Sequence, residues 1–247
     1  MSRPSLTRLL LTLLNVAFAF RAGTPPNPPP KIEDRRKYER DKSTKDLMTP
    51  HLWWFIPLGL STLFFPHLVE IYVIFTAYFP ALSSRIIDTT IVHYASPPAT
   101  VTQHLQVSST YLFGTVLNLT GSVLRLFCYQ ALGRHFTFEL SLRDDHKLIT
   151  TGPYSLVRHP SYTGNFLIVA GLLVCQWGEG SWWKEFGIQE TVIGSAWDRV
   201  MTFVVVIYTI VMVNRTGKED TMLRKEFKGQ WERWSQKTPY KLVPGVY

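Results

Sequence analysis

Apolar residues are not spread evenly along this chain of 247 residues. They fall into separate runs, divided by polar or proline-rich segments, and each run is at or near the length of about 20 residues that crosses a bilayer as a helix. The runs are residues 5–20, 52–80, 110–132, 163–178 and 198–213. This pattern predicts an all-α, polytopic integral membrane protein with about five transmembrane helices.

Polar residues and prolines bear on how three of these runs cross the membrane. Residues 5–20 are short for a span and precede the proline-rich segment 24–30, so they form either a first membrane helix or a cleaved signal peptide. We favour the retained anchor, because cleavage would leave the basic segment 31–46 in the lumen. Residues 52–80 are interrupted by Pro57 and Pro66 and form either one kinked span or a re-entrant helix pair. In the third run, Arg125 lies near the end and is expected to snorkel toward water.

The charges between the runs predict a topology. Residues 31–51, 133–159 and 214–247 are rich in Lys and Arg, so the positive-inside tendency assigns them to the cytosol. Residues 81–109 are nearly neutral, and the connection between the last two runs is acidic, so both are assigned to the lumen. The N-terminus then also lies outside the cytosol.

The formal net charge of +8 raises the question of a nucleic-acid partner. A nucleic-acid-binding domain gathers its basic residues on one soluble face. Here they flank apolar spans, where attraction to an anionic leaflet accounts for them, so we expect membrane lipids as partners and no nucleic acid. The two cysteines, Cys128 and Cys175, lie inside apolar runs without the spacing of metal ligands, so neither a disulfide framework nor a metal site is predicted.

One polar stretch, from His146 to Tyr162, is richer in reactive side chains than a connection between membrane helices needs. It reads HKLITTGPYSLVRHPSY. If residues 163–178 and 198–213 form a hairpin, the tail returns to the same membrane face, and its polar residues meet this stretch. The two segments together predict a cytosol-facing cofactor pocket at the membrane surface.

Three residues carry the chemistry expected of such a pocket. Arg215 directly follows the last run, and its planar guanidinium suits a carboxylate held at that depth. Glu219 lies one helical turn further along the same face. Pro160 suits the first position of a helix and would place His159 at a helix N-terminus, where anions bind. Each has a plainer alternative: a cation flanking a span, half of an intrahelical ion pair, and a simple helix cap.

The second half of the chain carries a series of short motifs. They are Gly152-Pro153-Tyr154, then Arg158-His159-Pro160-Ser161-Tyr162-Thr163-Gly164, then Arg215-x-x-x-Glu219-Asp220-x-x-Leu223, and finally Phe227-x-Gly229-x-Trp231-x-x-Trp234. In this order they resemble the isoprenylcysteine carboxyl methyltransferase family, over roughly residues 110–247. That family usually has Tyr at the two Trp positions and a second Glu at the position of Asp220.

The resemblance implies an endoplasmic-reticulum enzyme of CaaX protein processing, with its active site facing the cytosol. It would move a methyl group from S-adenosyl-L-methionine to the carboxylate of a prenylated C-terminal cysteine, leaving a methyl ester. Arg215 is the implied catalytic and substrate-binding residue. The implied cofactor-binding residues are Glu139, His146, Lys147, Leu148, Ile149, Tyr154, His159, Pro160, Ser161, Tyr162 and Glu219. Within this set, Leu148 and Ile149 are expected to be strand-like, and the two tyrosines to offer flat faces to an adenine or a sulfonium. Glu139 stands where the family can carry Gln.

We divide the chain into an N-terminal anchor with a charged cytosolic linker (1–50), membrane span(s) with a luminal loop (51–109) and a methyltransferase core (110–247). The methyl acceptor stays open between prenylated protein C-termini, small prenylcysteine-like substrates, and a phospholipid amine or other membrane lipid. An NADPH-dependent sterol reductase-like protein and a non-catalytic membrane adaptor are further alternatives. The sequence also leaves the oligomeric state open.

Overall fold

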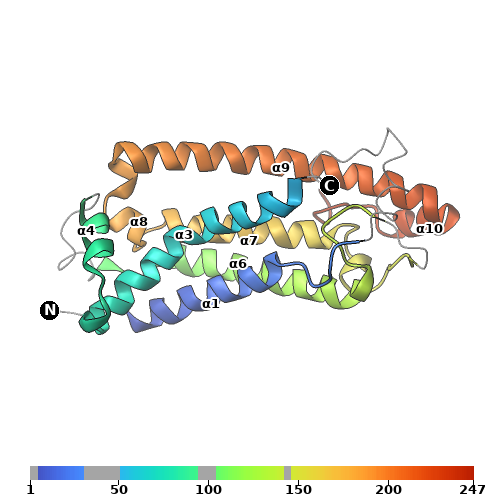
Figure 1. The fold of residues 1–247 in the computed structure, drawn as a ribbon. Helices are drawn as coiled ribbons and strands as arrows, with labels where there is room; N and C mark the ends of the chain where they lie inside the picture. The colour runs from blue at the N-terminus through green and yellow to red at the C-terminus, as the bar shows by residue number, and fades with distance from the viewer. Residues whose placement is uncertain (1–4, 31–50, 94–103, 142–145) are drawn as a thin grey trace. The chain divides into compact units, whose positions relative to one another are not determined.

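The computed structural model describes residues 5–30, 51–93, 104–141 and 146–247. Throughout these residues the regular structure is helical (Figure 1). The long helices are α1 (Leu6–Gly23), α3 (Leu52–Tyr78), α6 (Ser109–Leu132), α7 (Pro160–Trp177) and α9 (Val192–Phe227). Of these, α1, α3, α6 and α9 contain segments that are long and apolar enough to cross a membrane. The predicted all-α, polytopic fold is therefore confirmed.

Shorter elements connect and follow these helices. They are η3 (Pro80–Leu82), α4 (Arg85–His93), η5 (Gly133–His135), η6 (Gly152–Ser155), α8 (Trp182–Glu185), η7 (Ile188–Glu190) and α10 (Gly229–Lys237).

The structure decides between the alternatives for one predicted span, and two other predicted spans differ from the observed helices. The region 52–80 holds one continuous helix rather than a re-entrant pair. Helix α7 carries Asn165 and Gln176 among its apolar residues, and by composition it is not one of the four candidate spans. Helix α9 continues well past residue 213, so the predicted cytosolic tail begins as the same helix.

The chain groups into two compact units, and each long helix contributes residues to both. The first unit comprises Met1–Phe20, Gly59–Thr120 and Leu167–Val206, and the second comprises Arg21–Leu58, Gly121–Phe166 and Ile207–Tyr247. Both segments assigned to the lumen fall in the first unit, and those assigned to the cytosol fall in the second. Of these segments, residues 31–50, 94–103 and 142–145 lie outside the described residues. This grouping agrees with the predicted topology, while the sidedness itself stays a prediction.

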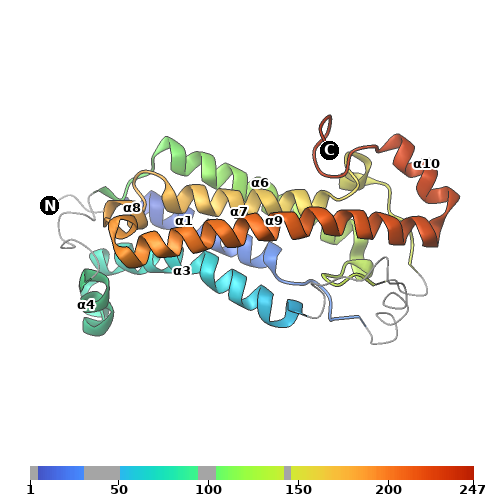
Figure 2. The same ribbon diagram turned by 90° about the horizontal axis from the view of Figure 1, so that it is seen from above.

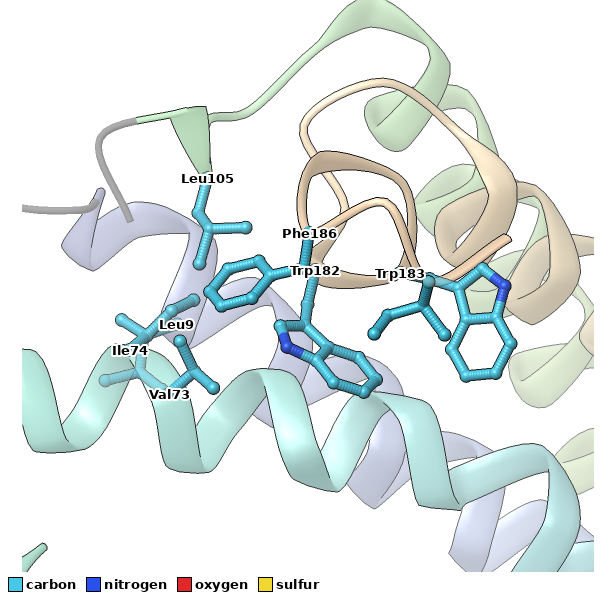
Figure 3. Packing of buried hydrophobic residues seen from close by; sticks show 8 residues of the cluster. Leu9, Val73, Ile74, Leu105, Trp182, Trp183 and Phe186 are labelled. Atoms are coloured by element: carbon cyan, nitrogen blue, oxygen red, sulfur yellow. The ribbon is translucent and has the colours of Figure 1, made fainter. Parts of the chain in front are cut away.

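The first unit has an aromatic core at one end of its helices. Figure 3 shows the side chains that form it, which come from α1, α3, and α8 with the residues just after it, together with Leu105. Its buried members are Leu9, Val73, Ile74, Leu105, Trp182, Trp183, Phe186 and Ile188. Large apolar rings bury enough surface here to hold the connection between α7 and α9 against α1 and α3.

Beside this core lies a fully desolvated ion pair. Arg8 is 0% exposed, and its Nε donates to Glu70 Oε1 at 2.8 Å while its Nη2 donates to Glu70 Oε2 at 3.1 Å. Glu70 also accepts from the Thr12 hydroxyl at 3.1 Å and from the Trp182 backbone N–H at 2.9 Å. The guanidinium carbon of Arg8 lies 4.0 Å from the centre of the Tyr111 ring. A buried carboxylate is tolerated when its lone pairs are satisfied in this way.

In the second unit the prediction for Arg125 was wrong. Its side chain does not reach water: the residue is 7% exposed, and its guanidinium donates to the Ala22 carbonyl at 2.8 Å, the Ser161 carbonyl at 3.1 Å and the Tyr129 hydroxyl at 2.9 Å. Snorkelling would give up all three of these charge-assisted hydrogen bonds, which offset the cost of holding the cation inside the protein. Arg125 thus ties the ends of α1 and α7 to α6.

Helices α6 and α7 run side by side in both views (Figures 1 and 2) and approach each other at glycines. A Cβ atom built on Gly171 would lie 2.5 Å from the Asn118 backbone nitrogen, and one on Gly164 would lie 2.7 Å from the Gly121 carbonyl oxygen. Small residues at helix contacts allow close backbone packing in membranes. The glycines are therefore required by the contact itself.

We expect Gly171→Ala to destabilise the protein, because its methyl group meets backbone atoms that cannot move aside. Overpacking of this kind costs about 1–3 kcal/mol. Gly59→Ala in α3 is the matched control, since nothing lies within 4 Å of its added methyl, and alanine favours a helix over glycine by about 1 kcal/mol. The thermal midpoint in detergent should fall for the first variant and stay or rise for the second. Equal midpoints would contradict the close packing.

Candidate functional site

The candidate site lies in the second unit and begins where α7 starts. The C-terminal segment fixes the two residues before α7, because the Arg158 N–H donates to the Tyr240 carbonyl at 2.9 Å and the His159 N–H donates to the Lys241 carbonyl at 2.8 Å. Pro160 then opens the helix, where its missing N–H costs nothing. As a result His159 is only 3% exposed, with its ring turned inside the protein.

Two consecutive carboxylates of α9 meet this helix start. The Tyr162 hydroxyl donates to Glu219 Oε2 at 2.9 Å, and His159 Nε2 lies 3.0 Å from Asp220 Oδ1. The other ring nitrogen, His159 Nδ1, lies 3.8 Å from Glu219 Oε2. Arg158 Nη2 is 3.5 Å from Asp220 Oδ2. We call these five residues the His159 cluster.

Members of the His159 cluster differ in how far a ligand can reach them. The side chains of His159 and Asp220 are 2% and 10% exposed, whereas that of Glu219 is 26% exposed. Asp220 therefore forms its contacts inside the protein. Glu219 keeps open surface on which its carboxylate can accept hydrogen bonds from a bound molecule.

Arg215 lies one turn before Glu219 on α9 and is 6% exposed. Its Nη2 donates to the Phe138 carbonyl, which ties the segment before α7 to α9. The Phe138 ring in turn lies 5.3 Å from the guanidinium carbon of Arg125. The arginine is thus held in a fixed position close to the segment that carries Glu139.

The remaining predicted site residues occupy the segments that lead to α7. The ring of His146 lies 4.9 Å from that of His135 and 5.9 Å from that of Phe227, and Lys147 is exposed. Leu148 and Ile149 are not strand-like, so that prediction was wrong. They lie in a segment without regular structure and pack on a hydrophobic cluster. Apolar packing, rather than pairing with another strand, fixes this segment.

Tyr154 belongs to that same cluster, with Cys128, Trp231 and Trp234, and is 8% exposed. Its carbonyl accepts the Trp234 indole N–H at 3.1 Å. Burial raises the pKa of the Tyr154 hydroxyl well above its usual range, and the nearby Glu219 acts in the same direction. The hydroxyl therefore stays protonated at neutral pH. Packing in this cluster is enough to explain a tyrosine at position 154. The predicted contact of Tyr154 with a cofactor stays a prediction.

Direct contacts thus join His159, Tyr162 and Glu219, as the hairpin argument predicted. Two cluster members had no predicted role. In the sequence, Asp220 was noted only because it replaces the second Glu of the family motif. Arg158 was noted only as a member of a motif. The sequence feature that could have revealed them is a basic dipeptide, Arg158-His159, before Pro160, together with an acidic dipeptide, Glu219-Asp220, on α9.

The residues present fit S-adenosyl-L-methionine, which carries a carboxylate, an ammonium group and two ribose hydroxyls. Glu219 offers a partly open acceptor for the hydroxyls or the ammonium group. Among the described residues, the buried Arg158 Nε and Trp231 Nε1 make no hydrogen bond, and the Arg158 guanidinium carbon lies 5.6 Å from the Trp231 ring centre. Such donors suit an anionic group. No group of three or more His, Cys, Asp or Glu side chains within the described ranges is placed to hold a metal ion.

Comparison with known proteins points to the same part of the chain. Residues 114–178 match the model of the isoprenylcysteine carboxyl methyltransferase (ICMT) family. This match includes the motif around His159 and stops short of the α9 carboxylates. No solved structure matches the chain.

Curated relatives fall into two groups. Protein-S-isoprenylcysteine O-methyltransferase B of Arabidopsis thaliana is 41% identical over 68 residues, which cover 27% of this chain and 32% of the relative. A probable protein-S-isoprenylcysteine O-methyltransferase of Oryza sativa subsp. indica is 32% identical over 126 residues, 50% of this chain and 56% of the relative. Delta(14)-sterol reductase of Neurospora crassa is 27% identical over 129 residues, 46% of this chain and 26% of the relative.

The chain therefore spans between about a quarter and about half of the length of these relatives. The family match contains the first two motifs, Gly152-Pro153-Tyr154 and Arg158 to Gly164. The predicted resemblance is confirmed: residues 114–178 are similar to the isoprenylcysteine carboxyl methyltransferase family, and curated proteins of that name are similar to this chain.

Proposed function

We propose that this protein is a membrane methyltransferase that uses S-adenosyl-L-methionine to esterify the carboxylate of a prenylated cysteine. The acceptor would be a prenylated protein C-terminus or a small prenylcysteine-like molecule, at the endoplasmic-reticulum membrane with the site facing the cytosol. The observation that carries the proposal is the contact of His159 and Tyr162 with Asp220 and Glu219. It joins two motifs that lie far apart in the sequence. The relatives named protein-S-isoprenylcysteine O-methyltransferase support it.

Methyl transfer to a carboxylate requires mainly that the protein position the two reactants. A C-terminal carboxylate has a reference pKa of about 3.5 and is ionised at neutral pH, so it needs no general base. When bound, the cofactor supplies an electrophilic methyl group on a sulfonium. The protein has to hold the carboxylate beside it and keep competing water away.

Arg215 is the residue proposed to hold that carboxylate. Its position on α9 follows the apolar, poorly buried part of the helix directly, so a lipid-anchored carboxylate would arrive at its depth. With Nη2 held on the Phe138 carbonyl, the guanidinium keeps one orientation. A fixed fork loses little entropy when it binds a carboxylate.

The His159 cluster is proposed to hold the cofactor. Glu219 would accept from its hydroxyl or ammonium groups, while Tyr162 and His159 fix the direction of that carboxylate. The other predicted cofactor-binding residues stay proposals at their observed places. They are Glu139, His146, Lys147, Leu148, Ile149, Tyr154, Pro160 and Ser161.

A sterol reductase is the second candidate, because the similarity to Delta(14)-sterol reductases covers nearly as much of the chain as that to the methyltransferases. The two alignments cover similar shares of the chain, so coverage alone does not choose between the two groups. The match to the methyltransferase family model and the 41% identity favour the first group. A phospholipid amine acceptor is disfavoured for a different reason: it must lose a proton, and we recognise no clear base for that step beyond His146.

Ligand titration separates the two enzyme classes. Purified full-length protein in detergent is titrated calorimetrically with S-adenosylhomocysteine and, separately, with NADPH. We expect saturable binding of S-adenosylhomocysteine that Glu219→Ala weakens, and no binding of NADPH. Binding of NADPH alone would overturn the proposal in favour of a reductase.

We expect Asp220→Asn to weaken S-adenosylhomocysteine binding roughly tenfold, because a charge-assisted hydrogen bond to His159 becomes a neutral one. The KM for the methyl acceptor should stay unchanged, since Asp220 acts through His159. Asp220→Glu keeps the carboxylate and should restore most of the affinity. Equal affinity of the wild type and the Asn variant would show that this contact only supports the fold.

A further inference from the structure

Helix α4, in the first unit, follows the end of α3 after the short turn η3 and carries alternating polar and apolar residues, RIIDTTIVH. In both ribbon views it stands beside the end of α3 (Figures 1 and 2). The candidate span in α3 ends at Tyr78, only a few residues before α4 begins. The helix therefore starts close to where the chain leaves the membrane.

A polar residue of α4, Asp88, attaches this helix to the protein. Tyr72 of α3 donates its hydroxyl to Asp88 Oδ1 at 2.8 Å and accepts the Ser84 backbone N–H at 2.8 Å. These two bonds fix the first turn of α4 and turn Asp88 toward α3. Amphipathic helices of water-soluble proteins instead pack their apolar face, rather than a carboxylate, on the protein core.

Two isoleucines of α4 are exposed. Ile86 is 79% exposed and Ile87 is 44% exposed, and Leu82 just before them is 63% exposed. Exposed apolar surface costs about 25 cal/mol per Å² in water. Three such side chains close together in the chain, beside a helix that is attached through a carboxylate, indicate an apolar environment outside the protein.

The exposed residues next to α4 indicate that this apolar environment is lipid. On α3, Phe75 is 38% exposed and Phe79, just after the helix, is 54% exposed, as expected of side chains that face lipid. This surface continues along the chain into Leu82 and Ile86. We propose that α4 lies in the membrane–water interface, with Ile86 and Ile87 inserted among the lipids of the leaflet on the predicted luminal side. Arg85, exposed at its first turn, is placed to meet lipid phosphate groups.

Depth-dependent quenching tests this placement. A single cysteine is introduced by Ile86→Cys, or by Thr89→Cys as the matched control on the polar side of α4, and labelled with an environment-sensitive fluorophore in nanodiscs. The parent protein sets the background, because Cys128 and Cys175 are both buried. Lipids with a nitroxide at a shallow or a deep acyl position act as quenchers.

An interfacial helix buries its apolar face about 5–10 Å into the headgroup and acyl boundary, so shallow quenching at residue 86 should exceed that at residue 89 by about twofold. At residue 86 the shallow nitroxide should also quench more than the deep one. Stronger quenching by the deep nitroxide would place the helix in the hydrocarbon core and overturn the proposal. Equal, weak quenching at both positions would overturn it in favour of water or of a second copy of the chain.

Discussion

Arg215→Ala is expected to lower kcat/KM for a farnesylated cysteine analogue by roughly a hundredfold or more, since misplacing one reactant by about 1 Å already costs this much. The variant loses the only group proposed to orient the acceptor carboxylate. Binding of S-adenosylhomocysteine should change little, because the contacts of Glu219 with Tyr162 and of Asp220 with His159 remain. Initial rates measured at several concentrations of each substrate give the two effects separately.

Arg215→Lys is the matched control for this prediction. It keeps the positive charge and loses the planar fork, so its rate should lie between those of the wild type and the alanine variant. The thermal midpoints of both variants must be measured as well, because Arg215 also donates to the Phe138 carbonyl. If a well-folded alanine variant keeps full activity, Arg215 is only a cation that flanks a span.

Removing Arg8 is expected to have the largest effect on stability. Arg8→Met leaves Glu70 buried without its cation, and the loss of one partner of a buried pair costs about 3–5 kcal/mol. The thermal midpoint of the protein in detergent should therefore fall sharply. The double variant Arg8→Met with Glu70→Met should recover most of the loss, because no unpaired charge then remains.

Additive losses in that pair of variants would show that the two side chains act independently. A strong interaction energy would instead make α1 an integral part of the first unit. The contacts of Arg8 and Thr12 with Glu70 favour a retained helix at residues 6–23 over a cleaved signal. That interpretation stays a prediction, which the fate of α1 in the mature protein would decide.

Four of the five predicted spans could be read from the sequence, because lipid-facing helices must be apolar over a length set by the bilayer. The buried arginines could not. Arg8 and Arg125 both stand in runs where a cation would be expected to reach water, yet each is buried and bonded to side chains or carbonyls far away in the sequence. Such partners arise only from tertiary packing, which periodicity does not report. The end of α9 was missed for a related reason, since a helix that leaves the membrane keeps its conformation while its composition changes.

The site followed from topology and motifs together. The hairpin argument placed Glu219 near the His146–Tyr162 stretch, and the structure joins Glu219 to Tyr162 and His159. The choice of Asp220 as the partner of His159 could not be predicted, because it depends on the rotation of α9 about its axis. Tyr154 shows the opposite limit: its place in a motif indicated a ligand, while its packing puts it in the core.

The central claim is methyl transfer to a prenylcysteine carboxylate, and one measurement tests it most directly. Membranes containing the protein are incubated with S-adenosyl-L-methionine carrying a labelled methyl group and with a farnesylated cysteine analogue, in parallel with the Arg215→Ala variant. The account predicts label in a base-labile methyl ester of the analogue for the wild type, and little for the variant. Label that appears only in base-stable lipid products, or no labelled product although the cofactor binds, would contradict it.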